Sequence, residues 1–180
     1  MKWYSLIDKV YSLPNLLESW YEVRKNKGRG GVDKESIEEF EGNLNQNLKE
    51  LHRLLKERRY IPSPVRQVLI PKSSSGDLRP LGIPTIRDRV VQQAIKTIIE
   101  PIFERKFKDV SYGYRPKRGA REAIQKCKEY IVSGYRWVVD ADITSFFDTV
   151  DHKLLMKALN EEIADGTLLD LIERFLKSGV

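Results

Sequence analysis

The chain has almost no cysteine. Of its 180 residues only Cys127 carries a thiol, so no disulfide can form within the chain. Disulfides are typical of oxidising compartments, and their exclusion fits a reducing one, so we expect a cytoplasmic protein. Cys127 lies at helical spacing from Ala123, Ile124 and Ile131. This spacing predicts a core position for Cys127 rather than a catalytic thiol.

Long apolar runs are absent as well. No uninterrupted apolar segment approaches the roughly 20 residues that a membrane span requires. Asp8 and Lys9 interrupt the short apolar stretch near the N-terminus, which therefore does not resemble a secretory signal. Apolar residues make up 41% and charged residues 32% of the chain, a composition typical of a globular protein rather than a disordered one. We expect one domain, or a domain and a half, with no membrane partner.

Charge is unevenly distributed along the chain, whose net charge is +6. Residues 49–72 hold seven basic side chains against two acidic ones, and residues 101–121 again hold seven against two. Residues 138–180 reverse the balance, with nine acidic side chains against four basic ones. Two basic segments and one acidic segment would suit a phosphate backbone and metal ions, respectively. Solvation of ordinary helix faces is the alternative.

The periodicity of the sequence predicts an α+β protein that is mainly helical. Apolar residues recur every three or four positions in the segments 14–27, 33–55, 87–107, 120–134, 151–159 and 167–175. Residues 65–70 and 78–83 read as two strands joined by a polar loop, and Pro71, Pro80 and Pro84 favour a projecting or edge hairpin. Gly28, Gly30 and Gly31 follow a helix rather than a strand, which favours a turn over a phosphate-binding loop.

Residues 137–143 read as a further strand, one that carries two carboxylates on one face. Alternate residues of a strand share a face, so Asp140 and Asp142 would point away from Val139 and Ile143. Because unpaired buried charge is costly, such a pair favours a bound divalent cation. Phe147 follows closely and could place a rigid ring beside whatever the metal holds.

Several other residues are candidates for phosphate or nucleic-acid contact. Lys72 and Arg79 lie near the tip of the expected hairpin, where they could bind a triphosphate. Arg87 lies at the highly charged start of a predicted helix. Its role could be an ion-pair cap of that helix or a contact with the template. Aromatic rings interleaved with cations suit stacking on bases, and residues 111–119 have this pattern, with Tyr112, Tyr114, Arg115, Lys117 and Arg118.

Four segments, in order, resemble reverse transcriptases, and in particular the enzymes encoded by bacterial group II introns. DITSFFDTVDH (142–152) resembles the first carboxylate motif of that family. NKGRGGVDKESIEEFE (26–41) resembles its N-terminal extension, IPKSSSGDLRPLGIPTIRDRVVQQA (70–94) its fingers hairpin and following helix, and SYGYRPKRGAREAI (111–124) its next motif. The resemblance covers roughly residues 20–180.

This resemblance implies a helical N-terminal extension (1–60), mainly helical fingers with a projecting β-hairpin (61–134) and the first part of a right-hand polymerase palm (135–180). It implies that Asp142, helped by the backbone carbonyl of Ile143, binds catalytic Mg²⁺, with Mn²⁺ as an alternative. Phe147 would exclude a ribose 2′-hydroxyl, and Lys72 and Arg79 would contact the incoming dNTP. Asp140 is expected to be structural or to lie outside the direct ligands.

The partners implied are an RNA template, intron RNA, a DNA or RNA primer, and dNTP. The residues expected to bind RNA or primer are Arg53, Lys56, Arg58, Arg59, Arg87, Tyr112, Arg115, Lys117 and Arg118. The family's second carboxylate motif, an aromatic-x-Asp-Asp turn, does not occur in the 180 residues, so we expect this chain to be inactive alone. A non-enzymatic RNA-binding module of the maturase type, and fragments of retron, diversity-generating or CRISPR-associated reverse transcriptases, remain alternatives.

Overall fold

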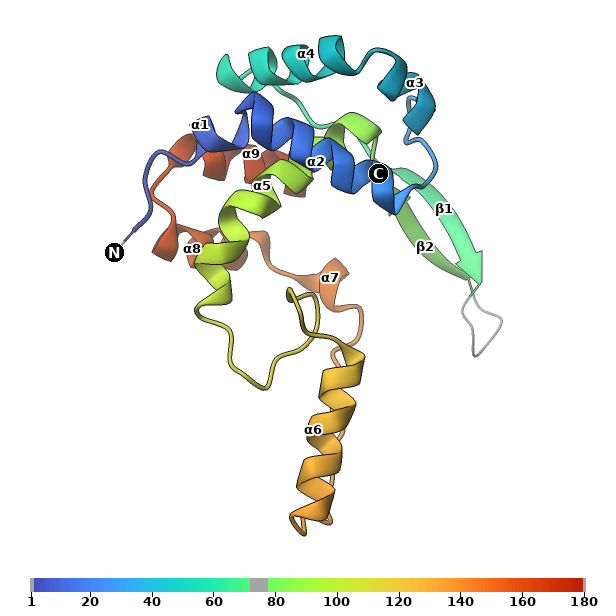
Figure 1. Ribbon diagram of the computed structural model, residues 1–180, viewed down its shortest axis with the longest axis vertical. Coiled ribbons are helices and arrows are strands. Elements are labelled where there is room, and N and C mark those ends of the chain that lie inside the picture. Colours follow the sequence, from blue (N-terminus) through green and yellow to red (C-terminus); the bar gives the residue numbers. More distant parts are fainter. Residues whose placement is uncertain (1, 72–77, 180) are drawn as a thin grey trace. The chain divides into compact units, whose positions relative to one another are not determined.

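The computed structural model describes residues 2–71 and 78–179 and divides into two compact units (Figure 1). Unit 1 comprises residues 1–99 and 151–180, and unit 2 comprises residues 100–150. The secondary structure is mainly helical with one two-stranded antiparallel sheet, which confirms the expected α+β class. No helix among the described residues is both long and apolar enough to cross a membrane.

Unit 1 begins with four helices whose ends are set by local capping. They are α1 (Ile7–Val10), α2 (Leu13–Asn26), α3 (Ile37–Gly42) and α4 (Leu44–Lys56). Ser12 caps α2, and Ser36 forms a reciprocal capping box with Glu39 at the start of α3. The periodicity predicts one helix over residues 33–55. The structure has two, because the first begins after Ser36, whose hydroxyl accepts the Glu39 N–H, and it is interrupted at Asn43.

The core of unit 1 lies where α2, α4, α5 (Ile86–Glu104) and α9 (Gly166–Lys177) come together (Figure 1). Trp20 of α2 stacks on Phe40 of α3, with ring centroids 4.8 Å apart. Leu51, Val90 and Leu168 contribute further fully buried side chains from α4, α5 and α9. These are the apolar stripes that the helical periodicity predicts.

The C-terminal helices belong to unit 1 because they bind the N-terminal segment. The backbone N–H of Trp3 donates to Glu162 at the end of α8 (His152–Glu162), at 2.7 Å. Asp165 caps α9 with one carboxylate oxygen and accepts the N–H groups of Leu6 and Ile7 with the other, each at 2.8 Å. The compact units therefore cut across the three expected segments, whose assignment as extension, fingers and palm stays a prediction.

The expected hairpin is present as β1 (Arg66–Pro71) and β2 (Leu78–Ile83). The strands are antiparallel, with Leu69 opposite Pro80 and Ile70 opposite Arg79. The glycine segment before α3 packs close to the end of this hairpin. A Cβ atom on Gly31 would lie 2.6 Å from the backbone nitrogen of Thr85, so close approach of the two backbones explains that glycine.

Unit 2 contains the end of α5, α6 (Ala120–Val132) and α7 (Phe146–Thr149). Cys127 of α6 is exposed, so the expectation of a core position was wrong. Helical spacing shows only which residues share a face. Within unit 2, as far as the structure describes it, no other element buries this face of α6.

The predicted strand at residues 137–143 was also wrong, since these residues adopt neither helix nor strand. A strand needs a neighbouring strand for its backbone N–H and C=O groups, and none of the described residues pairs with this segment. Trp137 is 95% exposed, and Val138 and Val139 are similarly open. The apolar composition predicts burial that unit 2 itself does not provide.

Candidate nucleotide and nucleic-acid interface

Asp142 lies in the exposed segment that precedes α7, next to the equally exposed Asp140. Carboxylate oxygens and a backbone carbonyl such as that of Ile143 have the right chemistry for a hard divalent cation. Across residues 2–71 and 78–179, however, no three His, Cys, Asp or Glu side chains gather closely enough to hold a metal ion. The donor type of Asp142 fits Mg²⁺, but the described residues supply only part of a ligand set.

Phe147 lies on α7, where it projects from the surface of unit 2 and is 74% exposed. Its ring meets the ring of Tyr114 edge-on, with centroids 6.2 Å apart and planes at 87°. Phe146 lies against Phe147 at 5.4 Å. The structure thus joins the predicted motifs at 111–124 and 142–152 through aromatic contacts within one unit, which sequence spacing does not reveal.

The hairpin places Arg79 on β2 in an exposed position, opposite Ile70. Lys72, its expected partner in nucleotide binding, lies outside the described residues. Leu69, Pro71, Leu78 and Pro80 occupy the other face, and all four are exposed. The position of Arg79 is therefore compatible with a ligand contact, because its side chain is open to solvent.

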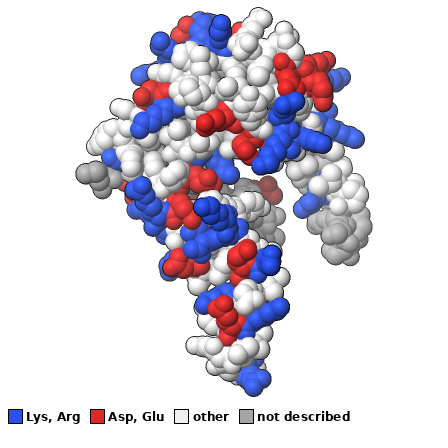
Figure 2. Space-filling model, viewed as in Figure 1, with Lys and Arg blue, Asp and Glu red and all other residues white. Residues whose placement is uncertain are grey.

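The first basic segment lies on α4 and the turn after it, where acids accompany several of its cations. Arg53 pairs with Glu50 at 3.5 Å and with Glu57 at 3.2 Å, and Arg59 shares Glu57 at 3.3 Å. Lys56 and Arg58 are exposed. On the face that Figure 2 shows, basic and acidic side chains are interspersed.

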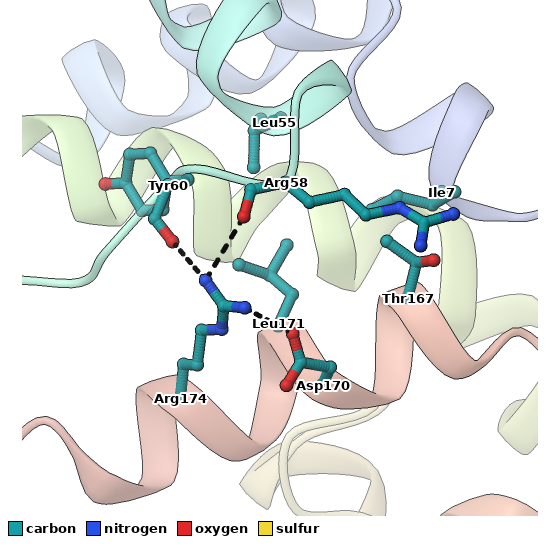
Figure 3. A pocket seen from close by; sticks show the side chains of 8 residues that line it. All are labelled: Ile7, Leu55, Arg58, Tyr60, Thr167, Asp170, Leu171 and Arg174. Carbon is teal, nitrogen blue, oxygen red and sulfur yellow. Dashed lines mark hydrogen bonds and ion pairs between the residues drawn. The ribbon is translucent and has the colours of Figure 1, made fainter.

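Arg58 lines a small cavity of unit 1 that the sequence did not predict (Figure 3). Its volume is about 10 Å³, enough for one water molecule at most. Arg174 of α9 donates to the carbonyl oxygens of Arg58 and Tyr60 at 3.3 and 3.2 Å, and it pairs with Asp170 at 2.7 Å. These contacts satisfy the backbone after α4 and fix the turn that carries Arg58 and Arg59.

Arg87 joins three elements of unit 1. Its guanidinium donates to Asn47 of α4 at 2.7 Å, lies 3.6 Å from the carboxylate of Glu35, and sits over the ring of Phe40. Burial raises the pKa of Glu35, an effect that the charge of Arg87 opposes. Of the two alternatives for Arg87, the structure favours the ion pair over a template contact.

The neighbouring Asp88 is fully buried and is a residue whose importance the sequence analysis missed. It accepts hydrogen bonds from the Tyr60 hydroxyl at 2.7 Å, the Thr85 hydroxyl at 2.6 Å and the Ser63 N–H at 3.2 Å. Burial, followed by the charge of Asp88, raises the pKa of Tyr60 well above its ordinary range. The pattern Thr85-x-x-Asp88 at the start of α5 was the available signal, since it is a capping-box spacing.

In the second basic segment, Arg115 is buried rather than available to phosphate. Its guanidinium donates to both carboxylate oxygens of Glu104, at 2.6–3.1 Å, and to the carbonyl oxygens of Lys108 and Ser111 at 2.6 and 2.9 Å. The hydrogen bonds from Arg115 lower the pKa of Glu104. An RNA contact would have to break this network, so the structure favours a role in ordering the loop.

The other members of this segment are more accessible. Arg118 pairs with Asp109 at 3.0 Å and lies over the ring of Tyr112 at 5.9 Å. Lys117 is exposed. Among the residues that the structure describes, the predicted RNA-binding cations Lys56, Arg58 and Lys117 are exposed and form no ion pair, so they are readily available to a phosphate.

Comparison with known proteins adds direct evidence of kinship. Residues 70–179 match the family model described as reverse transcriptase (RNA-dependent DNA polymerase). The matched part contains β2 and the end of β1, together with Tyr112 to Arg118, Asp142 and Phe147.

Three named relatives agree. Protein YkfC of Escherichia coli is 42% identical over 153 residues, covering 83% of this chain and 40% of that protein. The group II intron-encoded protein LtrA of Lactococcus lactis is 40% identical over 139 residues, covering 77% of this chain and 23% of that protein. Nuclear intron maturase 1 of Arabidopsis thaliana is 35% identical over 94 residues, covering 52% of this chain and 13% of that protein. The chain spans less than half the length of each of these relatives.

Proposed function

Since the chain belongs to the reverse transcriptase (RNA-dependent DNA polymerase) family, we propose that it forms the template- and nucleotide-binding part of a group II intron-type RNA-directed DNA polymerase. The observation that carries this proposal is that the exposed strand β2 with Arg79 and the exposed Asp142–Phe147 segment both fall within the matched residues. Likeness to LtrA supports the group II intron type. The relatives are longer proteins than the part aligned here, so the whole reaction is part of the proposal.

Asp142 contributes one carboxylate to a divalent metal site, with the Ile143 carbonyl beside it. Bound Mg²⁺, or Mn²⁺ in its place, would lower the pKa of the primer 3′-hydroxyl and offset charge on the triphosphate. Among the described residues, no group of three or more His, Cys, Asp or Glu side chains completes this site. Asp140 keeps its proposed role outside the direct ligands.

Phe147 lies under the sugar of the incoming nucleotide and excludes a 2′-hydroxyl by steric contact. Arg79 and Lys72 bind the triphosphate, for which a planar guanidinium and a mobile ammonium are both suited. Lys56, Arg58, Arg59, Lys117 and Arg118 hold the RNA backbone, and Tyr112 supplies an aromatic face for a base. Ion pairs limit some of the predicted cations. Arg53, Arg59 and Arg118 are minor members because each already pairs with an acid, and Arg87 and Arg115 leave the set because acids and other protein groups hold their guanidinium groups.

Primer extension tests the proposal. The 180-residue chain alone is expected to give none. An extended chain, made by joining it to the part of LtrA that follows the matched region, is expected to polymerise. In the extended chain Asp142→Asn should lower incorporation by at least about a thousandfold, because metal-ion catalysis supplies several kcal/mol, while RNA binding stays unchanged. Equal activity of wild type and Asp142→Asn would reject the assignment, with Asp140→Asn as the matched control.

Binding of intron RNA without polymerisation is a second candidate function, favoured by the likeness to an intron maturase. In that case the chain should bind structured RNA tightly, and the extended chain should remain unable to extend a primer. Splicing assays with Asp142→Asn separate the two functions, because this substitution should abolish polymerisation and leave a purely RNA-binding activity intact.

A further inference from the structure

Two exposed rings of unit 2 are held against each other by unusual backbone. Tyr114 has φ = 55°, and Ser145, which precedes Phe146 and Phe147, has φ = 50°. Residues other than glycine rarely adopt this left-handed backbone conformation, and a residue with a bulky ring that does so is an outlier. Outliers of this kind persist only where the surroundings fix them, and they concentrate at functional sites.

Burial does not explain the arrangement. Tyr114 is 93% exposed and Phe147 is 74% exposed, so neither ring fills a core. Their edge-on contact at 6.2 Å is nevertheless the geometry that aromatic pairs prefer. Exposed apolar rings gathered at one place are expected where a ligand will cover them.

Arg115, the residue after Tyr114, holds the backbone of this loop in place. Arg115 has a side chain only 5% exposed, and its guanidinium binds Glu104 and the carbonyl oxygens of Lys108 and Ser111. It also lies over the ring of Phe107 at 5.3 Å. These contacts tie the end of α5 to the loop before α6, and they hold the backbone on the C-terminal side of Tyr114.

On the other side of the contact, α7 is fixed by its own turn. The N–H groups of Asp148 and Thr149 donate to the carbonyl oxygen of Ser145 at 3.0 and 3.1 Å. The Thr149 hydroxyl donates to the same oxygen at 3.1 Å. Phe147 therefore has an ordered backbone, but its exposed side chain has Tyr114 and Phe146 as its ring contacts among the described residues.

We infer that Tyr114 is a positioning residue for sugar selection: its ring, held by the Glu104–Arg115 ion pair, supports Phe147 in the orientation that excludes a ribose 2′-hydroxyl. The inference rests on the proposed role of Phe147. Without Tyr114, the Phe147 ring would rotate away and widen the space beside the sugar. Selectivity would fall although no atom that touches the nucleotide had been removed.

The first test uses the 180-residue chain itself, with aromatic residues labelled for nuclear magnetic resonance. Wild type should show a nuclear Overhauser effect between the rings of Tyr114 and Phe147, and Arg115→Lys should lose it. The Tyr130–Tyr135 pair, at 5.6 Å in the same unit, should keep its own signal in both proteins and serves as the internal control. Absence of the Tyr114–Phe147 signal in wild type, or its persistence in Arg115→Lys, would overturn the inference.

The second test measures selectivity in the extended chain as the ratio of kcat/KM for dNTP to that for rNTP. Tyr114→Ala should lower this ratio by about two- to tenfold, the factor that corresponds to an edge-on aromatic pair, with kcat for dNTP unchanged. Tyr114→Phe keeps the ring and should restore the ratio. Tyr130→Ala, whose ring pairs with Tyr135 in the same unit, is the matched control and should leave the ratio unchanged.

The outcomes separate this inference from the proposed function. If Phe147→Ala admits ribonucleotides and Tyr114→Ala does not, Phe147 works without support and the inference is wrong while the function stands. If Phe147→Ala itself leaves the ratio unchanged, the proposed role of Phe147 fails. A loss of dNTP turnover in Tyr114→Ala that equals the loss of rNTP turnover would show a general structural role and would also reject the inference.

Discussion

Two tryptophans mark the difference between the two units: Trp20 in unit 1 is fully buried, and Trp137 in unit 2 is 95% exposed. Among the described residues of unit 2, only Ile102 and Arg115 are buried, whereas unit 1 encloses large side chains from most of its helices. Unit 1 thus stabilises itself through its own core. Unit 2 instead keeps Asp142 and Phe147, the proposed metal and sugar residues, on its surface.

The comparison teaches that apolar character has different meanings in the two units. In unit 1 an apolar stripe indicates a core, because a facing helix covers it. In unit 2 the rings of Tyr114 and Phe147 lie open, and the geometry that places them comes from Arg115 and from left-handed backbone. Apolar periodicity in the sequence predicts core packing directly, but it does not directly predict a placement that depends on a buried arginine and on left-handed backbone.

The largest expected effect separates the two tryptophans. Trp20→Ala should lower the free energy of unfolding by about 3–5 kcal/mol, because it removes a fully buried ring stacked on Phe40. Trp137→Ala should change it by less than about 0.5 kcal/mol, as is usual for an exposed side chain. Urea unfolding followed by circular dichroism measures both, and equal losses would show that residues around Trp137 share a core.

Arg79→Ala tests the accessible side of the hairpin. Loss of a charge-assisted contact costs about 1.5–3 kcal/mol, so kcat/KM for dNTP in the extended chain should fall by roughly ten- to a hundredfold. Template binding should change much less. Arg66→Ala, at the other end of the hairpin, is the matched control, and a change below twofold for Arg79→Ala would mean that this arginine does not bind the triphosphate.

Asp165 connects the first and last segments of unit 1, and its replacement is the next effect in size. Asn offers one carbonyl oxygen and one amide donor, so Asp165→Asn cannot accept all four backbone N–H groups, at Leu6, Ile7, Thr167 and Leu168. An unsatisfied donor costs about 1–3 kcal/mol. Asp151→Asn is the control, because Asp151 only caps α8 and Asn is an equally good cap.

The same residue makes stability depend on pH. Burial opposes ionisation of Asp165, but the four N–H groups outweigh it and lower its pKa. A depressed carboxyl pKa stabilises the folded state above the unfolded value, near 3.9, and this stabilisation is lost as pH falls below it. Unfolding measured from pH 7 to pH 3 should therefore show a steeper acid loss in wild type than in Asp165→Asn, and parallel curves would contradict the assignment.

Asp165 also shows where sequence reasoning reached and where it stopped. The cap of α8 is local, because Asp151 accepts the N–H groups of residues only two and three positions ahead. The last helical segment was expected to begin at residue 167, yet Asp165 caps α9 and also binds Leu6 and Ile7, about 160 residues earlier. Local chemistry is readable from spacing, whereas contacts between distant segments are not.

The candidate site divides in the same way. The two hairpin strands could be predicted because alternation, prolines and a polar loop are local signals. The burial of Arg115 and the pairing of Arg87 with Glu35 could not be predicted. An arginine in a sequence does not show whether its guanidinium pairs with a carboxylate of the protein or is available to bind phosphate. The strand predicted at 137–143 failed for a related reason, because a strand is defined by a neighbour that the pattern does not contain.

The smallest expected effect tests whether paired and unpaired cations of unit 1 differ in RNA binding. Each phosphate contact lowers the slope of log K against log salt by about 0.7–0.9. Lys56→Ala should therefore make the slope shallower by about that amount. Arg53→Ala should change it less, because Glu50 and Glu57 already offset the Arg53 charge. Fluorescence anisotropy with a structured RNA at several salt concentrations measures the slopes.

Lys117→Ala repeats the comparison in unit 2, with Arg115→Lys as its paired counterpart. Identical slopes for wild type and both lysine variants would mean that neither lysine contacts RNA, and an equal change for Arg53→Ala would mean that ion pairing on α4 does not decide which cations bind phosphate.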